Sequence, residues 1–379
     1  MDSELTEEQK QIQKICREIA LEFKPYTDEA NKTNETFPPE IDKKAIRRLR
    51  ENKLLGLGIP EEYGGIGGPF LNILLAAEEF CTHAPRNYLA AHVIDSSAAG
   101  VVMHFLDIKK ENLKKRFVPK IINRELKLGL SMAEPLAGSA LTDLTTTATE
   151  DGDHYILNGI KRWGIWGGVA DFYYVYARLG NIPGGRGIMT FIVDKDTPGI
   201  SFGRDWGFWG VDTGCRRDVI FRDCRVPKEN VVTEAGELGK ALARFNSGRL
   251  QDAACTLGYA RGSLDDAIAY SKERMQFGKP LCEFQMIQDM LADMVMKVEA
   301  SRGLIYRAGA TVKSGTASPL LTSIAKAYCN QAAVEVCDRA CQIYGACGFV
   351  RGFPVEWRYS THSLQIILGI SNNAVAKLL

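Results

Sequence analysis

The spacing of hydrophobic and polar residues divides the chain into three stretches. In residues 6–124 the apolar positions recur at helical spacing, with interruptions at 37–39 and in the glycine-rich loop 59–68. Residues 130–233 contain short β-branched and aromatic runs separated by Gly, Pro and Asp, which is typical of strands. Helical periodicity returns in residues 234–379. The pattern therefore predicts helices, then a β unit, then helices.

This order of elements predicts an α+β fold with three domains. We expect an N-terminal α-helical domain at 1–126, a middle antiparallel, barrel-like β domain at 127–233, and a C-terminal four-helix bundle at 234–379. No strand is followed by a G-x-G-x-x-G turn and a helix. We therefore do not expect a Rossmann domain, and a dinucleotide cofactor would have to be held in another way.

Composition narrows the class of protein further. The 379 residues carry 47 Lys and Arg against 46 Asp and Glu, so the net charge of +1 gives no reason to expect a nucleic-acid partner. No apolar run approaches the roughly 20 residues that span a bilayer, so membrane insertion is not expected. The ten cysteines form no metal-binding spacing, and the charged N-terminus resembles no signal or transit peptide. We expect a cytoplasmic protein with reduced thiols and no metal site.

A loop of small residues is the first candidate binding motif. In SMAEPLAGSA, residues 131–140, the turn Ala137–Ser139 would let backbone N–H groups approach an anion or a ring edge closely. The Ser139 hydroxyl would be an additional donor. An ordinary β-turn is the alternative interpretation.

Two further motifs suit a ligand that carries phosphate groups. The break at Phe277 after Arg274 would let a guanidinium point at a pyrophosphate. Gln342 with Gly345 and Gly348 combines a planar amide with glycines that permit close backbone approach. A surface arginine and an ordinary helix C-cap are the respective alternatives.

Five strings, in this order, resemble signatures of the flavin-dependent acyl-CoA dehydrogenase family and span almost the whole chain. They are SMAEPLAGSA (131–140), KRWGIWGG (161–168), FRDCRVPKENVV (221–232), RMQFGKPLCEFQMIQDMLADM (274–294) and QIYGACGFVRGFPVE (342–356). The resemblance implies the acyl-CoA dehydrogenase fold, FAD as cofactor and an acyl-CoA thioester as substrate. It also implies an electron-transfer flavoprotein as electron acceptor and a homotetramer built as a dimer of dimers.

The resemblance also assigns roles to individual residues. Flavin contacts are expected at Ser131, Met132, Ala133, Ser139, Trp163, Gly164, Ile165, Arg274, Phe277, Gln285, Gln342, Ile343, Gly345, Ala346, Ser371 and Asn372. Substrate contacts are expected at Ser139, Asn246, Arg249, Arg86, Leu368 and Gly369. In the family, the Arg274 region and the 342–346 loop serve a flavin that is shared across a subunit interface.

Asn246 and Arg249 stand three apart on one helical face and resemble the family's Asp-x-x-Arg pair, which meets the pantetheine and phosphates of CoA. Asn246 stands where the family has aspartate, so it keeps a polar contact but lacks the negative charge. A solvated helix face is the alternative. At Ala133 and Ile165 the family has threonine, so we expect a more apolar pocket wall here.

The chain departs from the family at the catalytic base. The two positions at which the family carries a glutamate base are Leu368 and Gly248 here, and the neighbours Ile367 and Gly369 offer no carboxylate either. Both usual bases are therefore missing. The chain is then inactive, has moved its base, or acts on a substrate without an α-proton.

Asp95 is the candidate for a relocated base. It lies in a helical run of small and apolar residues that aligns with the segment lining the acyl pocket in the family. A carboxylate in such surroundings would be desolvated, which suits a general base. A helix N-cap before Ser96 and Ser97 is the alternative. His92, three residues earlier, is a candidate hydrogen-bond partner, although a core histidine is the expected reading.

A base that lies deeper in the acyl pocket than the α-carbon suits a substrate whose acyl group is an α,β-unsaturated ring. The sequence thus resembles the cyclohex-1-ene-1-carboxyl-CoA dehydrogenase branch of aromatic degradation, with 1,4-elimination to the cyclic diene cyclohexa-1,5-diene-1-carboxyl-CoA and Asp95 as base. Alternatives are a desulfinase acting on 3-sulfinopropionyl-CoA, with Arg86 holding the sulfinate, and an ordinary acyl-CoA dehydrogenase with a relocated base. A CoA-thioester-binding protein without chemistry and a flavin monooxygenase are further alternatives.

Overall fold

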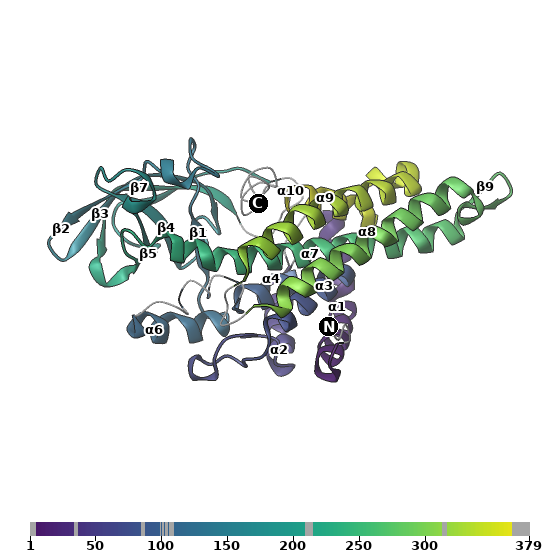
Figure 1. Ribbon diagram of the computed structural model, residues 1–379, viewed down its shortest axis with the longest axis horizontal. Helices are drawn as coiled ribbons and strands as arrows, with labels where there is room; N and C mark the ends of the chain where they lie inside the picture. Colours follow the sequence, from purple (N-terminus) through teal and green to yellow (C-terminus); the bar gives the residue numbers. More distant parts are fainter. Residues whose placement is uncertain are drawn as a thin grey trace.

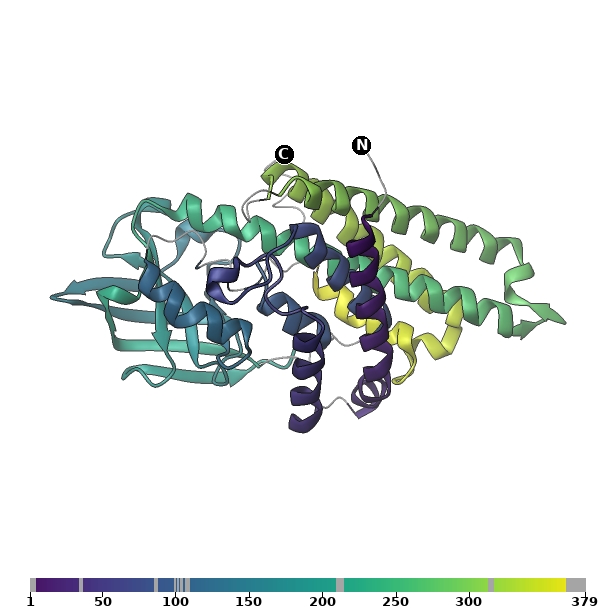
Figure 2. The same cartoon turned by 90° about the horizontal axis from the view of Figure 1, so that it is seen from below.

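The computed structural model places helices around and beside one β domain. It describes residues 5–33, 37–84, 88–98, 100, 102, 105, 110–208, 215–312 and 317–365. Figure 1 shows the β domain at one end of the molecule and the long C-terminal helices extending to the other end. The N-terminal helices lie against the middle of the molecule in Figure 2.

The N-terminal domain is helical, as predicted. Its helices are α1 (Glu7–Thr33), α2 (Pro39–Glu51), the 3₁₀ turn η1 (Glu61–Tyr63), α3 (Phe70–His83), α4 (Tyr88–Asp95) and α6 (Glu111–Ile122). α2 begins with a proline at its first turn and carries acidic residues there and basic residues at its end, which favours a helix through the backbone dipole. α3 is buried along almost its whole length, so it forms the centre of this domain.

The middle domain is a single sheet of eight strands. The strands are β1 (Leu128–Ser131), β2 (Thr147–Asp151), β3 (His154–Ile165), β4 (Phe172–Leu179), β5 (Ile188–Asp194), β6 (Ile200–Asp205), β7 (Arg216–Pro227) and β8 (Val231–Thr233), with 3₁₀ turns η2 (Leu141–Asp143), η3 (Gly184–Gly187) and η4 (Lys228–Asn230). The order is β6-β7-β3-β2-β4-β5-β8, and β1 pairs with β4. Most pairs are antiparallel, as expected, but β4 is parallel to both β1 and β2.

The C-terminal part is a bundle of long helices. These are α7 (Leu238–Glu273), α8 (Gln285–Ala310), α9 (Pro319–Tyr344) and α10 (Pro354–Gln365), with 3₁₀ turns η5 (Leu281–Glu283) and η6 (Gly345–Phe349). A small hairpin of β9 (Met275–Gln276) and β10 (Lys279–Pro280) joins α7 to α8. Both turn residues, Phe277 and Gly278, have positive φ values of 49° and 79°, as a two-residue hairpin turn requires. The predicted α+β fold is confirmed.

Three expectations about the class of protein can be compared with the structure. No helix in the described ranges is long and apolar enough to cross a membrane. All ten cysteines are free thiols. Within the same ranges, no three or more His, Cys, Asp or Glu side chains gather in a way that could hold a metal ion.

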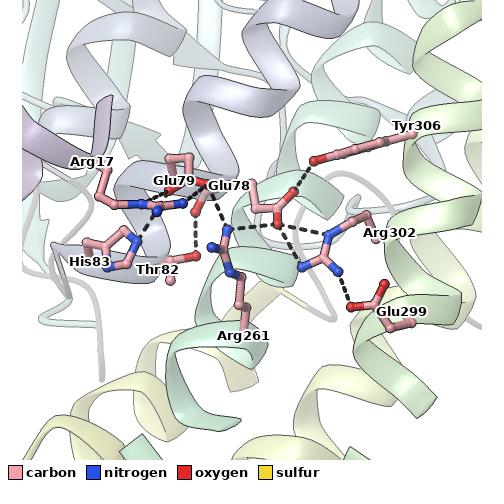
Figure 3. A network of polar contacts seen from close by, with 9 residues as sticks. All are labelled: Arg17, Glu78, Glu79, Thr82, His83, Arg261, Glu299, Arg302 and Tyr306. Atoms are coloured by element: carbon pink, nitrogen blue, oxygen red, sulfur yellow. Dashed lines mark hydrogen bonds and ion pairs between the residues drawn. The ribbon is translucent and has the colours of Figure 1, made fainter. Parts of the chain in front are cut away.

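The helical parts are joined by a buried acid pair on α3 (Figure 3). The side chains of Glu78 and Glu79 are completely buried. Glu79 meets Arg17 of α1 at 3.2 Å, Arg261 of α7 at 2.8 Å, and His83 on its own helix at 3.3 Å. Burial by itself would raise the pKa of Glu79, but hydrogen bonds from these three groups outweigh it and lower the pKa to about 2.

Glu78 extends the same network towards α8. Its Oε1 lies 3.1 Å from Arg302 and 3.3 Å from Arg261, and its Oε2 accepts a 2.7 Å hydrogen bond from the Tyr306 hydroxyl. Glu299 is a further partner of Arg302. Burial and the charge of Glu78 raise the pKa of Tyr306, so its hydroxyl remains a donor. Side chains of α1, α3, α7 and α8 therefore meet in one charge network.

The network should make the fold sensitive to acid. The pKa of Glu79 falls from its ordinary 4.5 to about 2 on folding. Its contribution to the free energy of unfolding is therefore complete above pH 4.5 and is lost as the pH falls towards 2. We expect the free energy of unfolding to lose about 3 kcal/mol over this window through Glu79. Urea unfolding followed at several pH values measures this slope.

Glu79→Gln should remove most of that pH dependence and lower the free energy of unfolding at pH 7 by about 3–5 kcal/mol, since Arg17 and Arg261 lose the buried charge that they pair with. Glu7→Gln is the control, because Glu7 pairs with Lys10 on an exposed face of α1. An unchanged acid slope in Glu79→Gln would contradict the assignment.

Candidate active site

Two backbone carbonyls of the loop after β1 accept hydrogen bonds from residues of β3. Ser131 ends β1, and its hydroxyl is buried with no hydrogen-bond partner in the described part of the chain. The Met132 carbonyl accepts a hydrogen bond from Lys161 at 3.1 Å, and the Ala133 carbonyl accepts one from the Arg162 N–H at 2.9 Å. The predicted flavin-binding residues of this loop therefore lie beside those of β3.

A buried ion pair fixes the shape of this loop. Lys161 and Glu134 are 2.7 Å apart, and neither side chain is more than 2% exposed. The Glu134 carboxylate also accepts from the Thr145 N–H and hydroxyl at 2.6 and 2.7 Å, and from the Thr146 N–H at 3.0 Å. Burial opposes the charged form, yet the Lys161 charge and these donors lower the pKa of Glu134 to about 2. Burial lowers the pKa of Lys161 to about 8.

The end of β3 has an irregular backbone. A register shift against β7 lies between Lys161 and Gly164, and Trp163 in between has a positive φ of 66°. A Cβ atom at Gly164 would come within 2.6 Å of the Val219 side chain and 3.4 Å of the Ser131 hydroxyl. Only glycine fits this position, so the sheet backbone approaches the loop closely.

These features fit the flavin that the sequence predicts. The unpartnered Ser131 hydroxyl can meet a polar edge of a ring system, and the strand next to it presents backbone instead of a side chain at Gly164. Ile165 follows as a partly buried residue at the end of β3, and Ser139 is exposed at the far side of the loop. The loop and the strand end together would hold the ring.

Asp95 is the residue that the sequence predicts as the base. It is the last residue of α4, so the N-cap alternative does not apply. Its Oδ2 lies 3.1 Å from the Arg124 guanidinium, and about a quarter of its side chain remains exposed. Asp95 also interacts electrostatically with Arg216, which pairs in register with Ile165. The desolvated carboxylate expected from the sequence is therefore corrected to one that is partly exposed and has a cationic partner.

The histidine near Asp95 has a different partner. His92 Nε2 lies 2.8 Å from Oδ1 of Asp42 on α2, and the ring is largely buried. Burial lowers the pKa of His92, against the raising effect of Asp42. His92 therefore serves the packing of α4 on α2, as expected for a core histidine.

The predicted CoA-binding pair lies on α7. The Arg249 guanidinium donates to Asn246 Oδ1 at 2.9 Å and to the Ser323 hydroxyl of α9 at 3.4 Å. Arg249 is only 4% exposed, and its Nε has no hydrogen-bond partner among the described residues. The alternative of a solvated helix face is therefore wrong. Burial lowers the pKa of Arg249.

Two charged residues next to this pair were missed from the sequence. Asp252 follows Arg249 by one turn of α7. Lys326 of α9 is fully buried, and its charge interacts with the charges of Asp252 and Arg249. Burial raises the pKa of Asp252 to about 6 and lowers the pKa of Lys326 to about 8. In the sequence, the only signal for this cluster is an aspartate in the mostly apolar run after Arg249. That signal does not indicate that Lys326 on α9 interacts with it.

The remaining predicted flavin residues lie at the other end of the bundle. Arg274 follows α7, about 42 Å along the helix from Asn246. Figure 1 shows α7 starting beside the β domain and ending at the β9 hairpin. Phe277 and Gln285 belong to this hairpin end, and both are exposed. Within one chain, these residues cannot reach the β1 loop.

The 342–346 loop belongs to the same distant end. Tyr344 stacks on Tyr270 near the end of α7, with ring centroids 4.1 Å apart. Gln342, Gly345 and Ala346 are exposed, whereas the Ile343 side chain is buried in the bundle. The structure therefore divides the predicted flavin contacts into two groups at opposite ends. Arg86, Leu368, Gly369, Ser371 and Asn372 lie outside the described residues.

The Glu134 and Lys161 pair generates a stability prediction. Lys161→Met leaves a buried carboxylate without its cation, so we expect a loss of about 3–5 kcal/mol in the free energy of unfolding. Urea denaturation at pH 7 measures the change. Lys228→Met is the matched control, because its ion pair with Glu150 is exposed and should contribute little. Equal effects of the two variants would refute a structural role for the buried pair.

Comparison with known families agrees with this geometry. The family models for the N-terminal, middle and C-terminal domains of acyl-CoA dehydrogenase match residues 6–125, 129–224 and 238–374. The chain is 34% identical to the caffeyl-CoA reductase-Etf complex subunit CarC of Acetobacterium woodii over 357 residues, which are 93% of this chain and 92% of that protein. It is 33% identical to a 3-(aryl)acrylate reductase of Clostridium sporogenes over 360 residues, with the same coverage.

Solved structures show the same fold. The butyryl-CoA dehydrogenase structure from Megasphaera elsdenii superposes with a TM-score of 0.91 at 30% identity, covering 100% of this chain and 98% of that one. A glutaryl-coenzyme A dehydrogenase complex with glutaryl-CoA also gives a TM-score of 0.91, at 31% identity and with 100% and 95% coverage. The chain therefore belongs to the acyl-CoA dehydrogenase family and is an FAD-dependent oxidoreductase that acts on the CH–CH bond of acyl-CoA thioesters.

Proposed function

We propose that the protein converts cyclohex-1-ene-1-carboxyl-CoA to cyclohexa-1,5-diene-1-carboxyl-CoA by 1,4-elimination, with Asp95 as the base. One observation supports the proposal: the Asp95 carboxylate interacts electrostatically with Arg216, the register partner of Ile165 at the predicted flavin edge. The two positions that usually carry the base are Leu368 and Gly248. Asp95 is therefore our candidate for a carboxylate near the reacting ring.

The position of the base selects the substrate. A saturated thioester loses a proton from its α-carbon, and neither Leu368 nor Gly248 can accept it. In a 1-ene-1-carboxyl ring the α-carbon has no proton, and conjugation with the thioester makes the γ-carbon acidic instead. A carboxylate deeper in the acyl site can take that proton while a hydride leaves the ring carbon on the other side of the α-carbon. The products are a conjugated diene, a proton and a hydride.

Each residue has a separate role in this proposal. Asp95 accepts the γ-proton on a carboxylate oxygen, and the Arg124 contact at 3.1 Å orients the carboxylate. Asn246 and Arg249, with Ser139, bind the CoA part, and Leu368 leaves apolar room beneath the ring. FAD, when bound, supplies the hydride acceptor. A backbone N–H would polarise the thioester carbonyl and stabilise the developing negative charge.

Asp95→Asn tests the base directly. It keeps the size of the side chain and a hydrogen-bonding group beside Arg124 but cannot accept the proton, so we expect kcat to fall by about 10²–10⁴-fold. Anaerobic mixing with cyclohex-1-ene-1-carboxyl-CoA, followed through the flavin absorbance, measures flavin reduction. Asp42→Asn is the matched control. Asp42 lies on α2 and interacts with Arg124 and Lys127, two cations whose charges also interact with Asp95.

The same experiment has two decisive outcomes. No bleaching of the native flavin, or undiminished bleaching in Asp95→Asn, would sink the proposal. As a second arm, Leu368→Glu returns a carboxylate to the usual position and should add 1,2-dehydrogenation of the saturated cyclohexane thioester, which the native chain should not show.

A second candidate function is reduction of a conjugated acyl-CoA. The resemblance to a caffeyl-CoA reductase subunit and to a 3-(aryl)acrylate reductase favours this direction. The same residues would then return a proton to the substrate instead of removing one. Mixing chemically reduced enzyme with the cyclic diene or an aryl-acrylyl thioester distinguishes the directions, because only a reductase reoxidises its flavin at a useful rate. Release of sulfite from 3-sulfinopropionyl-CoA would favour a desulfinase instead.

We also propose an electron-transfer flavoprotein as the redox partner, because one similar protein is named as a subunit of a reductase-Etf complex. A soluble flavoprotein suits a chain in which no described helix could cross a membrane. The CoA thioester and this flavoprotein are then the two partners of the catalytic cycle.

Exposed apolar side chains support a homotetramer built as a dimer of dimers. Phe277 is 93% exposed and Met275 51% exposed at the hairpin, and Met286 and Met296 of α8 are similarly exposed. Large exposed apolar patches are typical of interfaces. Another protomer would bring this end, with Arg274, to the β1 loop. The two groups of flavin contacts would then form one site.

Phe277→Asp tests this assembly. A charge at the hairpin turn should weaken the interface, so we expect a smaller particle by light scattering and less flavin retained after gel filtration. Leu21→Asp is the control, because Leu21 is also exposed and apolar but lies on α1. A variant that keeps the native mass and flavin content would contradict the proposed assembly.

A further inference from the structure

The backbone is strained where β3 ends, in residues 164–168, which we call the β3 turn. Trp166 has a positive φ of 58°, a conformation that is rare for a bulky side chain, and Gly168 follows with a φ of 78°. Such a conformation persists only where the surrounding structure holds it, and it is found most often at functional sites. The predicted flavin contacts at 163–165 overlap the start of this turn.

A buried hydroxyl joins the two strained residues. The Gly168 N–H donates to the Tyr173 hydroxyl at 2.7 Å, and this hydroxyl donates to the Trp166 carbonyl at 3.0 Å. Tyr173 lies on β4 and is completely buried. Burial raises the pKa of Tyr173 to about 12, so the hydroxyl stays protonated and acts as donor and acceptor together. One oxygen atom therefore fixes both residues with positive φ.

The Tyr173 ring packs against the same part of the site. A Cβ atom at Gly129 of β1 would come within 2.6 Å of the Ile165 carbonyl oxygen and 2.8 Å of the Tyr173 ring. The strand β1, the end of β3 and the ring are thus packed without room for a methyl group. Gly129 shares a face of β1 with Ser131, whose buried hydroxyl has no partner among the described residues. Tyr173 therefore supports the region that fits the flavin.

Trp166 is held through its side chain as well. The Lys127 ammonium nitrogen lies 4.1 Å from the centre of the Trp166 ring. The Trp166 carbonyl also accepts hydrogen bonds from the N–H groups of Val169 and Ala170, both at 2.9 Å. These contacts, together with the Tyr173 hydroxyl, account for a tryptophan in the left-handed region.

We propose that Tyr173 is a positioning residue for the flavin, and that its hydroxyl keeps the β3 turn in the shape against which the ring system binds. At Ile165 the family has a threonine, so this chain has no hydroxyl there and depends more on the position of its backbone. The inference goes beyond the proposed function, because it needs only bound FAD and holds for any acyl-CoA substrate.

Tyr173→Phe tests the inference, because it removes the hydroxyl and keeps the ring. The β3 turn then loses the bridge between Gly168 and Trp166, so we expect FAD to leave the loaded protein about tenfold faster. Dilution of the FAD-loaded protein, followed through the fluorescence of the released FAD, measures this rate. The visible absorption spectrum of the flavin that remains bound should also change, since a displaced turn alters the surroundings of the ring.

Tyr174→Phe is the matched control. Tyr174 is the next residue of β4, packs on the opposite face of the sheet, and donates a buried 3.0 Å hydrogen bond to the Thr190 hydroxyl. This variant should lose about as much thermal stability as Tyr173→Phe. Its rate of FAD release and its flavin spectrum should nevertheless match those of the native protein.

The results separate positioning from general destabilisation. A native release rate and a native flavin spectrum in folded Tyr173→Phe would overturn the inference. Equally fast release from Tyr174→Phe would also overturn it, because lost stability alone would then explain the effect. If Tyr173→Phe does not fold, Lys127→Met takes its place: it removes the cation over Trp166 and should speed FAD release about threefold, and an unchanged rate would count against the inference. No arm uses a thioester, so the proposed function is judged separately.

Discussion

Two buried carboxylates on α3 determine how the helical parts of the molecule fit together. Glu78 and Glu79 are compensated only when Arg17 of α1, Arg261 of α7 and Arg302 of α8 all converge on them. A buried charge that loses its partner is far more costly than an exposed one, so alternative arrangements of these helices are disfavoured. α3 precedes α4, which ends at Asp95, and α7 carries the predicted CoA-binding pair. The acid pair thus ties the helix before α4 to the helix that carries Arg249.

The buried polar clusters differ in how completely they are satisfied. The Glu134 carboxylate accepts hydrogen bonds from Lys161, Thr145 and Thr146. These bonds support the predicted flavin-binding loop after β1. Between α7 and α9, by contrast, Arg249 Nε, Thr256 Oγ1 and Thr322 Oγ1 are buried without a hydrogen-bond partner among the described residues. In the proposed function, the first cluster would support the predicted flavin-binding loop, and the second would belong to the predicted CoA-binding surface.

The sequence predicted the parts of the structure that depend on local pattern. Periodicity separated the helical and strand regions because each period follows from backbone geometry. It could not predict charge partners that are distant in sequence. Glu78 and Glu79 are two acidic residues inside an apolar run, and nothing nearby indicates Arg302. The ion pair of Asp95 with Arg124 and the electrostatic interaction of Asp252 with Lys326 likewise depend on how segments distant in sequence pack.

The distance between the two groups of flavin contacts has a genetic consequence. In the proposed assembly, each cofactor would sit between the β1 loop of one subunit and the hairpin end of another. A lesion at Ser131 and a lesion at Arg274 would then damage different halves of a shared site. Subunits carrying one lesion each could combine so that one of their sites is intact. Two individually inactive alleles could therefore complement each other in one cell, whereas two lesions in the same half could not.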